Sequence, residues 1–282
     1  MSWLKRTDFS LDVGTTRVRL FERGRGVILD AAVEELLPEA EIPDRGERQK
    51  ALIKASFAKA GVRTGLFGRV RRLMLAIPSV YGDVERFACE KAAACVRASD
   101  GVYLIESPMA AALGADGKVS DPQATTVVDI GASRIQVAVI SLAGIAVFRG
   151  DARTPREGVA ALAEQTAGLI RSALSACLAQ ERYNLVDDIV RKGVVLTGGG
   201  AEEPGLADAL HASLNLPVKV TAEPRLAIIK GAGIVLGELD LLVLNGRKES
   251  AGLVGKIFAI VLTLYFLWCL RDVWSFWLGY LK

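Results

Sequence analysis

The chain has 282 residues, of which 51% are hydrophobic, and its formal net charge at pH 7 is +3. A chain of this length buries one large core or two of moderate size. Its Lys and Arg residues are scattered and form no basic block, which argues against nucleic acid as a partner. No apolar run follows the first residues, so no signal peptide is expected.

Few residues suit metal or nucleophilic chemistry. No Cys-x-x-Cys spacing occurs, so we expect reduced thiols rather than disulfides or a metal site at Cys89, Cys95, Cys177 and Cys269. The single histidine, His211, cannot build a His-rich metal site or, on its own, a Ser-His-Asp triad. We expect it to be an ordinary helix residue.

The first predicted elements form a strand–turn–strand unit near the N-terminus. An apolar strand ends in Asp12, the turn Gly14-Thr15-Thr16 follows, a second strand runs to Leu20, and a third is expected at Val27–Leu29. A tight glycine turn between strands points backbone N–H groups into one concavity, which suits a phosphate. A carboxylate at the strand end suits Mg²⁺ held through water.

The next segment alternates between helices and strands. Helices are predicted at residues 47–60, 83–98 and 108–115, and strands at residues 70–77 and 102–105. Prolines mark two of the boundaries, since one ends the first of these strands and another begins the third helix. Strands that alternate with helices indicate an α/β fold.

A second unit of the same kind begins near the middle of the chain. Residues 128–137 contain Asp129, Gly131 and Ser133 at the spacing of the first unit, and a third strand is expected at Ile145–Phe148. Two such units predict a duplication in which the hairpins face each other and grip a nucleotide between two lobes. The alternative is two unrelated surface hairpins.

The chain then continues the α/β alternation. A helix is predicted at residues 157–180 and a buried strand at residues 193–196, before the loop Gly198-Gly199-Gly200. Helices at residues 204–214 and 228–236 follow. A strand, a glycine-rich loop and a helix in this order place backbone N–H groups beside a phosphate or sugar.

The C-terminal part is the most apolar. We expect residues 243–256 to be a linker and residues 257–282 to be a membrane segment, either a single span with the N-terminus inside or a helix in the interface. The uncharged run at residues 257–270 is about 14 residues long, short for a span. Aromatic residues typical of a headgroup boundary lie within or after this run: Trp268, Trp274 and Trp277. A buried core helix is the alternative.

Four motifs in order resemble the bacterial actin family of MreB. They are Asp12–Thr15, Ile105–Ala112, Val128–Gly131 and Leu196–Ala201, and the similarity extends over roughly residues 8–242. The resemblance implies a duplicated actin-like, ribonuclease H-like core with a first lobe at residues 1–120 and a second at residues 121–242. Between the lobes it implies a cleft for ATP and Mg²⁺.

The resemblance also implies roles for single residues. Asp12 and Asp129 would hold the metal through water, and Glu106 matches the catalytic position that orients the attacking water. The nucleotide-binding residues implied in this way are Asp12, Gly14, Thr15, Thr16, Asp129, Gly131, Ser133, Gly198, Gly199 and Gly200.

The chain departs from the family pattern at the second phosphate turn and in its length. Ala132-Ser133-Arg134 stands where glycines and threonines are usual, and a Cβ restricts φ there. Ser107 replaces a carboxylate beside Glu106. The chain is too short for the first small subdomain between Leu29 and Glu47, and the second, expected between Phe148 and Val190, is missing. These departures imply at most a weak ATPase.

One loop resembles a membrane-inserting loop of the family. Leu66 and Phe67 lie between two glycines and are flanked by Arg63 and Arg69, a combination that suits an anionic membrane surface. The alternative is an ordinary loop packed on the core.

The predicted function is that of a membrane-associated, MreB-like cytoskeletal or scaffold protein that organises cell shape or envelope assembly. Expected partners are the cytoplasmic membrane, the chain itself, MreB-type filaments or cell-envelope proteins. The expected location is the cytoplasmic face of the inner membrane, with a C-terminal anchor. The alternatives are an actin-like ATPase switch that polymerises, and a membrane adaptor of a secretion or pilus assembly machine.

Overall fold

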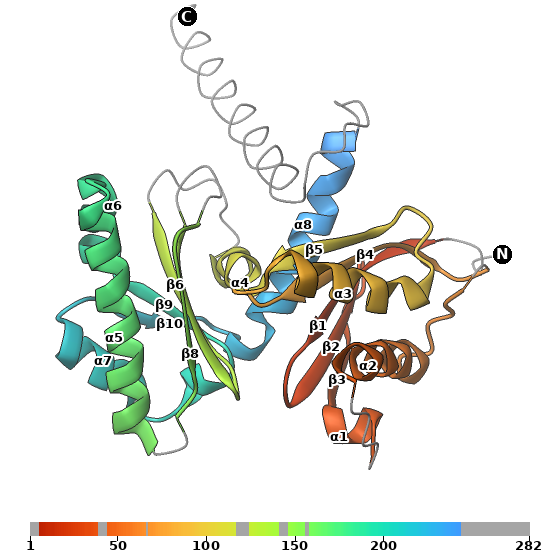
Figure 1. The fold of residues 1–282 in the computed structure, drawn as a ribbon, viewed down its shortest axis with the longest axis horizontal. Helices are drawn as coiled ribbons and strands as arrows, with labels where there is room; N and C mark the ends of the chain where they lie inside the picture. Colours follow the sequence, from red (N-terminus) through yellow and green to blue (C-terminus); the bar gives the residue numbers. More distant parts are fainter. Residues whose placement is uncertain are drawn as a thin grey trace, which may run out of the picture.

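Two five-stranded sheets form two lobes that lie side by side (Figure 1). The computed structural model describes residues 6–38, 44–65, 67–116, 124–140, 146–155 and 158–243. The strand order is β3-β2-β1-β4-β5 in the first sheet and β10-β9-β6-β7-β8 in the second. Because each sheet is an antiparallel meander extended by two parallel strands, the predicted duplicated α/β fold is confirmed.

The first lobe is built on the N-terminal meander. Its interior strand β4, between β1 and β5, carries a nearly continuous apolar run, as expected for a strand that is covered on both faces. Helices α2 and α3 pack on each other beside this sheet (Figure 1). The bounds are β1 Thr7–Val13, β2 Arg17–Glu22, β3 Gly26–Ala32, α1 Val33–Leu36, α2 Arg45–Lys59, β4 Val70–Ile77, α3 Asp83–Ala93, η1 Ala94–Val96 and β5 Val102–Glu106.

The second lobe repeats this plan. Its meander is followed by helices, and α5 packs against the outer side of the sheet together with α7 (Figure 1). The bounds are β6 Thr125–Ile130, β7 Arg134–Ile140, β8 Ala146–Arg153, α5 Gly158–Ala179, α6 Tyr183–Lys192, β9 Val194–Thr197, η2 Gly199–Glu202, α7 Leu206–Leu214, β10 Val218–Val220 and η3 Pro224–Leu226.

Two helices cross between the sheets and tie the lobes together (Figure 1). Helix α4, Ser107–Asp116, follows the first sheet but also contacts β6, β7 and β9 of the second. Helix α8, Ala227–Val243, follows the second sheet but packs on β1, β2 and β4 of the first. The helices cross at Gly114 and Gly231, each of which faces backbone atoms of the other helix. The lobes therefore share one central helix pair.

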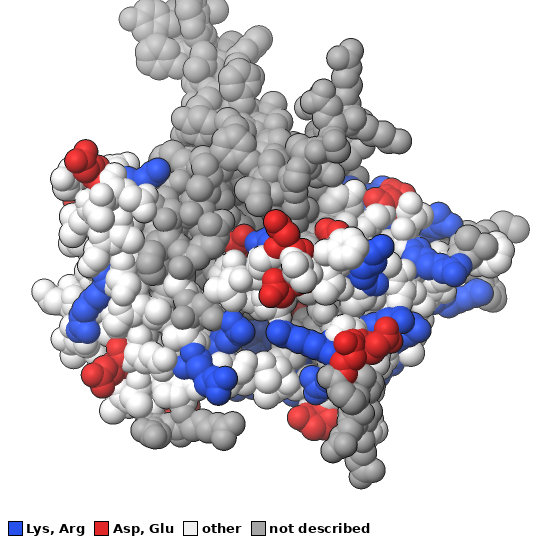
Figure 2. Space-filling model, in the orientation of Figure 1, with Lys and Arg blue, Asp and Glu red and all other residues white. Residues whose placement is uncertain are grey.

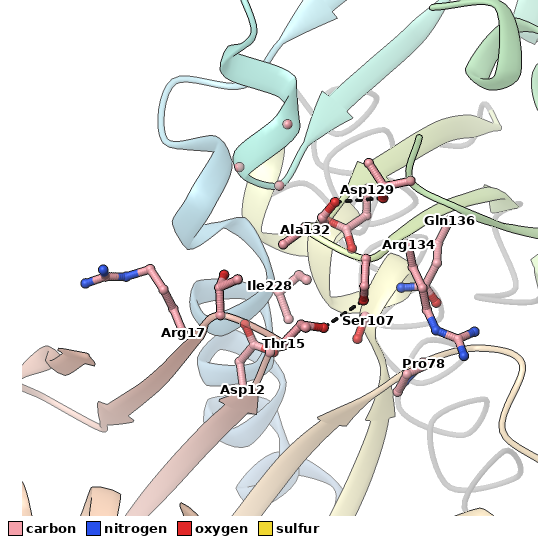
Figure 3. A pocket seen from close by; sticks show the side chains of 18 of the residues that line it. Asp12, Thr15, Arg17, Pro78, Ser107, Asp129, Ala132, Arg134, Gln136 and Ile228 are labelled. Carbon is pink, nitrogen blue, oxygen red and sulfur yellow. Dashed lines mark hydrogen bonds between the residues drawn. The ribbon is translucent and has the colours of Figure 1, made fainter. Parts of the chain in front are cut away.

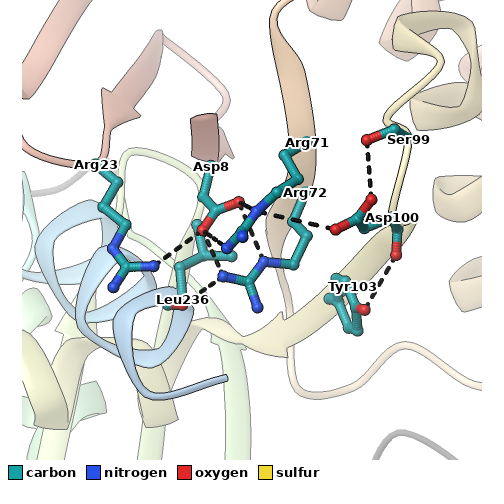
Figure 4. A network of polar contacts seen from close by, with 8 residues as sticks. All are labelled: Asp8, Arg23, Arg71, Arg72, Ser99, Asp100, Tyr103 and Leu236. Carbon is teal, nitrogen blue, oxygen red and sulfur yellow. Dashed lines mark hydrogen bonds and ion pairs between the residues drawn. The ribbon is translucent and has the colours of Figure 1, made fainter. Parts of the chain in front are cut away.

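A buried ion-pair cluster lies at the start of the first sheet. Asp8 of β1 accepts hydrogen bonds from Arg23, Arg71 and Arg72, and Arg72 also approaches the carbonyl oxygen of Leu236 in α8 (Figure 4). A register shift between β1 and β4 lets two consecutive arginines reach one carboxylate. The cluster thus joins the sheet to α8.

Most predicted elements are present, and a few were not predicted. The missed ones are α1, the short helices η2 and η3, the short edge strand β10 and α6, which is separated from α5 by a turn at Glu181 with φ +56°. Among the described residues, α1 alone stands between β3 and α2, and α5 and α6 alone stand between β8 and β9. The thiols of Cys89, Cys95 and Cys177 form no disulfide with one another.

The predicted membrane segment stays a prediction. None of the helices in the described ranges is long and apolar enough to cross a membrane. The predicted linker beyond Val243 and the segment 257–282 lie outside the described residues, and so do Cys269 and the three tryptophans Trp268, Trp274 and Trp277.

Candidate functional site

A cavity of about 1280 Å³ opens between the two lobes, and both lobes line it. The turn after β1 and the turn after β6 face each other across it (Figure 3). The face of α2, the loop after β4 and the glycine loop after β9 complete its walls. All the residues predicted to bind a nucleotide line this cavity: Asp12, Gly14, Thr15, Thr16, Asp129, Gly131, Ser133, Gly198, Gly199 and Gly200.

The two hairpin turns have the same local geometry. The backbone N–H of Gly14 donates to the oxygen of Arg17 at 3.0 Å, and that of Gly131 donates to the oxygen of Arg134 at 2.8 Å. A methyl group on Gly14 would lie 2.8 Å from the same Arg17 oxygen, so a side chain does not fit there. The two copies of the duplicated unit therefore share the same hydrogen-bonded turn.

The tips of the two turns meet. The hydroxyl oxygens of Thr15 and Ser133 are 2.7 Å apart and share a hydrogen bond across the cavity (Figure 3). Deeper in the molecule, Gln136 accepts hydrogen bonds from the backbone N–H of Ser79 at 3.0 Å and from its hydroxyl at 3.3 Å. These contacts join residues that are far apart in the sequence and define the cleft between the lobes.

The glycine loop packs directly on the end of β6. Gly198 has φ +82°, and a Cβ there would lie 2.4 Å from the oxygen of Ile130 and 2.6 Å from Oδ1 of Asp129. A Cβ on Gly200 would lie 2.3 Å from Cγ2 of Ile130. Only glycine therefore allows this loop to approach the second aspartate so closely.

Asp12 and Asp129 are both buried in the cleft. Burial raises the pKa of Asp12, and the nearby Arg19 guanidinium opposes this rise. Burial and, after it, the charge of Asp12 raise the pKa of Asp129 to about 7, although hydrogen bonds from Thr197 and Gln136 oppose the shift. The two carboxylates are thus electrostatically coupled, as expected for opposite halves of one site.

The stability of the ligand-free protein should therefore fall as pH rises from about 4 to 7. Asp129 holds its proton in the native state over this range, whereas the unfolded chain has already lost it. A native pKa of about 7 against the ordinary 3.8 corresponds to a destabilisation of about 4 kcal/mol.

Urea denaturation at pH 5 and pH 8 measures this effect. Asp129→Asn should remove most of the difference between the two pH values and should be more stable than the parent at pH 8. Asp187→Asn on α6, which removes an exposed carboxylate, is the control and should keep the parent's pH dependence. An unchanged pH dependence in Asp129→Asn would contradict the assignment.

Glu106 lies apart from the cavity. It ends β5, and its carboxylate accepts a hydrogen bond from Arg86 at 2.8 Å. It is absent from the residues that line the cavity, whereas the next residue, Ser107, lines it and donates its hydroxyl to the oxygen of Ile77 at 3.0 Å. In this conformation Glu106 is an ion-pair partner and does not face the cleft.

The cavity is rich in arginine, which sequence reasoning missed. Figure 2 shows Lys and Arg side chains gathered in a band across one face, over both lobes. The acidic side chains in the lining are Asp12, Asp129 and Glu203. The arginines in the lining come from both lobes and are Arg17, Arg19, Arg45, Arg48, Arg134, Arg153 and Arg225. A count of charges along the sequence does not reveal this set, because only the fold gathers it.

Comparisons with known proteins agree with this architecture. The family model described as MreB/Mbl protein matches residues 44–151 and 151–243. The cell shape-determining protein MreB of Escherichia coli K12 is 29% identical over an alignment of 232 residues, and the match covers 60% of this chain. The match covers 66% of the E. coli protein, just under two thirds of its length.

Solved structures show the same fold. The crystal structure of MreB5 of Spiroplasma citri bound to AMPPNP matches with a TM-score of 0.66 at 18% identity, over 86% of this chain and 99% of that one. The MamK double helical filament matches with a TM-score of 0.58 at 15% identity, over 83% and 99% of the two chains. The predicted actin-like core is therefore confirmed.

Proposed function

Because the chain belongs to the MreB/Mbl protein family, we propose that it is a cytoskeletal or scaffold protein that assembles with itself or with MreB-type filaments. The observation that carries this proposal is the family match, which spans residues 44–243 and so covers most of both lobes. The E. coli relative is a cell shape-determining protein, and MamK has been solved as a filament. Organisation of cell shape or of the envelope is the corresponding role.

We further propose that the cleft binds a nucleotide that regulates assembly. The twin glycine turns and the glycine loop support this, because they line the cavity between the lobes and turns of this kind suit an anion. The S. citri relative was solved with AMPPNP. Rapid hydrolysis is a weaker proposal, since Glu106 is held by Arg86 rather than placed to orient water.

Sedimentation tests the assembly proposal. The purified full chain should pellet at high speed together with MreB-type filaments, and electron microscopy should show ordered polymers rather than aggregates. Detergent should be present in every sample, because the apolar C-terminal segment alone can cause aggregation. A chain that stays in the supernatant both alone and with MreB would argue against the proposal.

We also propose that the protein lies on the cytoplasmic face of the inner membrane. Phe67 is 82% exposed in the loop between Arg63 and Arg69, which supports insertion of this loop into an anionic surface. Leu66 lies outside the described residues. The apolar sequence of residues 257–282 supports a second attachment point and the C-terminal anchor.

Phe67→Ser should weaken vesicle binding about tenfold in a chain that ends at Val243 and so lacks the apolar C-terminal segment. Loss of one buried aromatic side chain costs about 1.5 kcal/mol or more in membrane partitioning. Flotation with anionic phospholipid vesicles measures the bound fraction. Phe87→Ser on α3 removes another exposed phenylalanine and is the control. Equal binding of both variants and the parent would rule out the loop as a membrane contact.

A further inference from the structure

We infer that arginine side chains of the cleft, rather than Mg²⁺, neutralise the phosphates of a bound nucleoside polyphosphate. The inference deepens the proposed function, because it rests on a nucleotide in the same cleft. It differs from what the resemblance implies, which is a metal held through water by Asp12 and Asp129.

The first carboxylate of the implied metal site already faces a cation. Asp12 and Arg19 are direct partners in the β1–β2 register, and Nη1 of Arg19 lies 3.5 Å from Oδ2 of Asp12. The Arg19 side chain is only 12% exposed, and its Nε lies 3.3 Å from Oδ1 of Asp30. A guanidinium fixed in this way repels a divalent cation approaching Asp12.

None of the other described carboxylates completes a metal site. The carboxylate of Glu106 bonds to Arg86, and at the next position Ser107 offers only a hydroxyl, which donates to the backbone. The carboxylate of Asp129 accepts a hydrogen bond from the hydroxyl of Thr197 at 3.5 Å. Among the residues that the structure describes, no three His, Cys, Asp or Glu side chains are grouped as they would be to hold a metal.

Arginines surround the same space from both lobes. Arg45 and Arg48 come from α2 of the first lobe, and Arg153 and Arg225 come from β8 and η3 of the second. Arg45 is held in place by Tyr81, since its guanidinium lies 5.4 Å from the ring centroid and donates to the hydroxyl. Guanidinium groups bind phosphate oxygens in a bidentate manner, so this arrangement suits a chain of phosphates.

The cavity keeps an excess of positive charge when the acids that pair with its arginines are also counted. Arg17 pairs with Asp30 at 2.7 Å and Arg225 pairs with Glu202 at 2.7 Å. Even with these two acids added to Asp12, Asp129 and Glu203, arginines outnumber carboxylates among the described residues around the cavity. A ligand that brings several negative charges and no metal therefore matches the charge of the cleft.

Isothermal titration calorimetry of the full chain in detergent tests the inference. ATP in EDTA should bind at least as tightly as ATP with excess Mg²⁺. Arg48→Gln and Arg153→Gln, which change exposed side chains on opposite walls, should each weaken ATP binding in EDTA about tenfold. Lys54→Gln on α2 removes an exposed positive charge that does not line the cavity and should leave the affinity unchanged.

The outcomes separate the inference from the proposed function. Binding that requires Mg²⁺, no binding in EDTA, or equal affinities for the parent and both arginine variants would overturn the inference, whereas sedimentation with filaments would still support the family role. Tripolyphosphate in EDTA identifies the source of the phosphates. Tighter binding of ATP points to a nucleotide, and equal binding of tripolyphosphate points to inorganic polyphosphate; both support neutralisation by arginine.

Discussion

Gly231→Ala should leave the protein largely unfolded at temperatures where the parent is folded. A Cβ at this position would lie 1.8 Å from the carbonyl oxygen of Ala110 and 2.8 Å from the backbone nitrogen of Gly114. Both atoms belong to the backbone of α4, so no side-chain rotation relieves the clash. Helices α4 and α8 would have to separate, and with them the two lobes. We expect a loss of about 3–5 kcal/mol in the free energy of unfolding.

Denaturant unfolding followed by circular dichroism measures this loss. Gly237→Ala lies on the same helix and is the matched control, because its added Cβ would lie more than 4 Å from the described atoms outside that helix. It should be neutral or stabilise the protein by about 0.5–1 kcal/mol, since alanine favours a helix over glycine. If Gly231→Ala unfolds at the same denaturant concentration as the parent, the close crossing of α4 and α8 is wrong.

Asp8→Asn should have the next largest effect on stability. The Asp8 carboxylate is 1% exposed and accepts hydrogen bonds from Arg71, Arg72 and Arg23 (Figure 4). Against the effect of burial, hydrogen bonds from Arg71 and from the buried Arg72 hold the pKa of Asp8 well below its usual range. A neutral amide leaves this buried positive charge uncompensated, at a cost of about 3–5 kcal/mol.

The same measurement at several pH values identifies the cause. The stabilisation from Asp8 is fully present above the unfolded-state pKa of about 4 and is lost as pH falls further. Asp8→Asn should therefore lose most of its deficit relative to the parent in strong acid. Asp100→Asn removes a half-exposed carboxylate 3.9 Å from Arg71 and should cost less than about 1 kcal/mol. Equal losses in the two variants would refute the buried network.

The duplicated core was predictable because the signals that specify it are local. An apolar strand, an aspartate and a glycine turn recur in the same order, and Gly14 and Gly131 close their turns with the same hydrogen bond. The glycine loop was predictable for a similar reason, since Gly198 needs φ +82° next to Ile130. Patterns of this kind involve residues that are close together in the sequence, so a single sequence is enough to recognise them.

The arginine lining was not predictable, since its members come from separate elements. Arg48 lies on α2 and Arg153 on β8, and only the packing of the two lobes brings them to one cavity. The Asp8 cluster depends on a register shift between β1 and β4, which no motif reveals. The ion pair of Glu106 with Arg86 likewise depends on where α3 packs beside β5.

The central claim is that the turns after β1 and β6 are opposing halves of one clamp. Oxidation of Thr15→Cys/Ser133→Cys tests it most directly, because the native hydroxyl oxygens are 2.7 Å apart. Peptide mass spectrometry should find a disulfide between positions 15 and 133, and ATP in EDTA should slow its formation. The pair Thr15→Cys/Ser172→Cys, with the second cysteine on the exposed side of α5, should not form one. Two reactive thiols at positions 15 and 133 that never join would contradict the clamp.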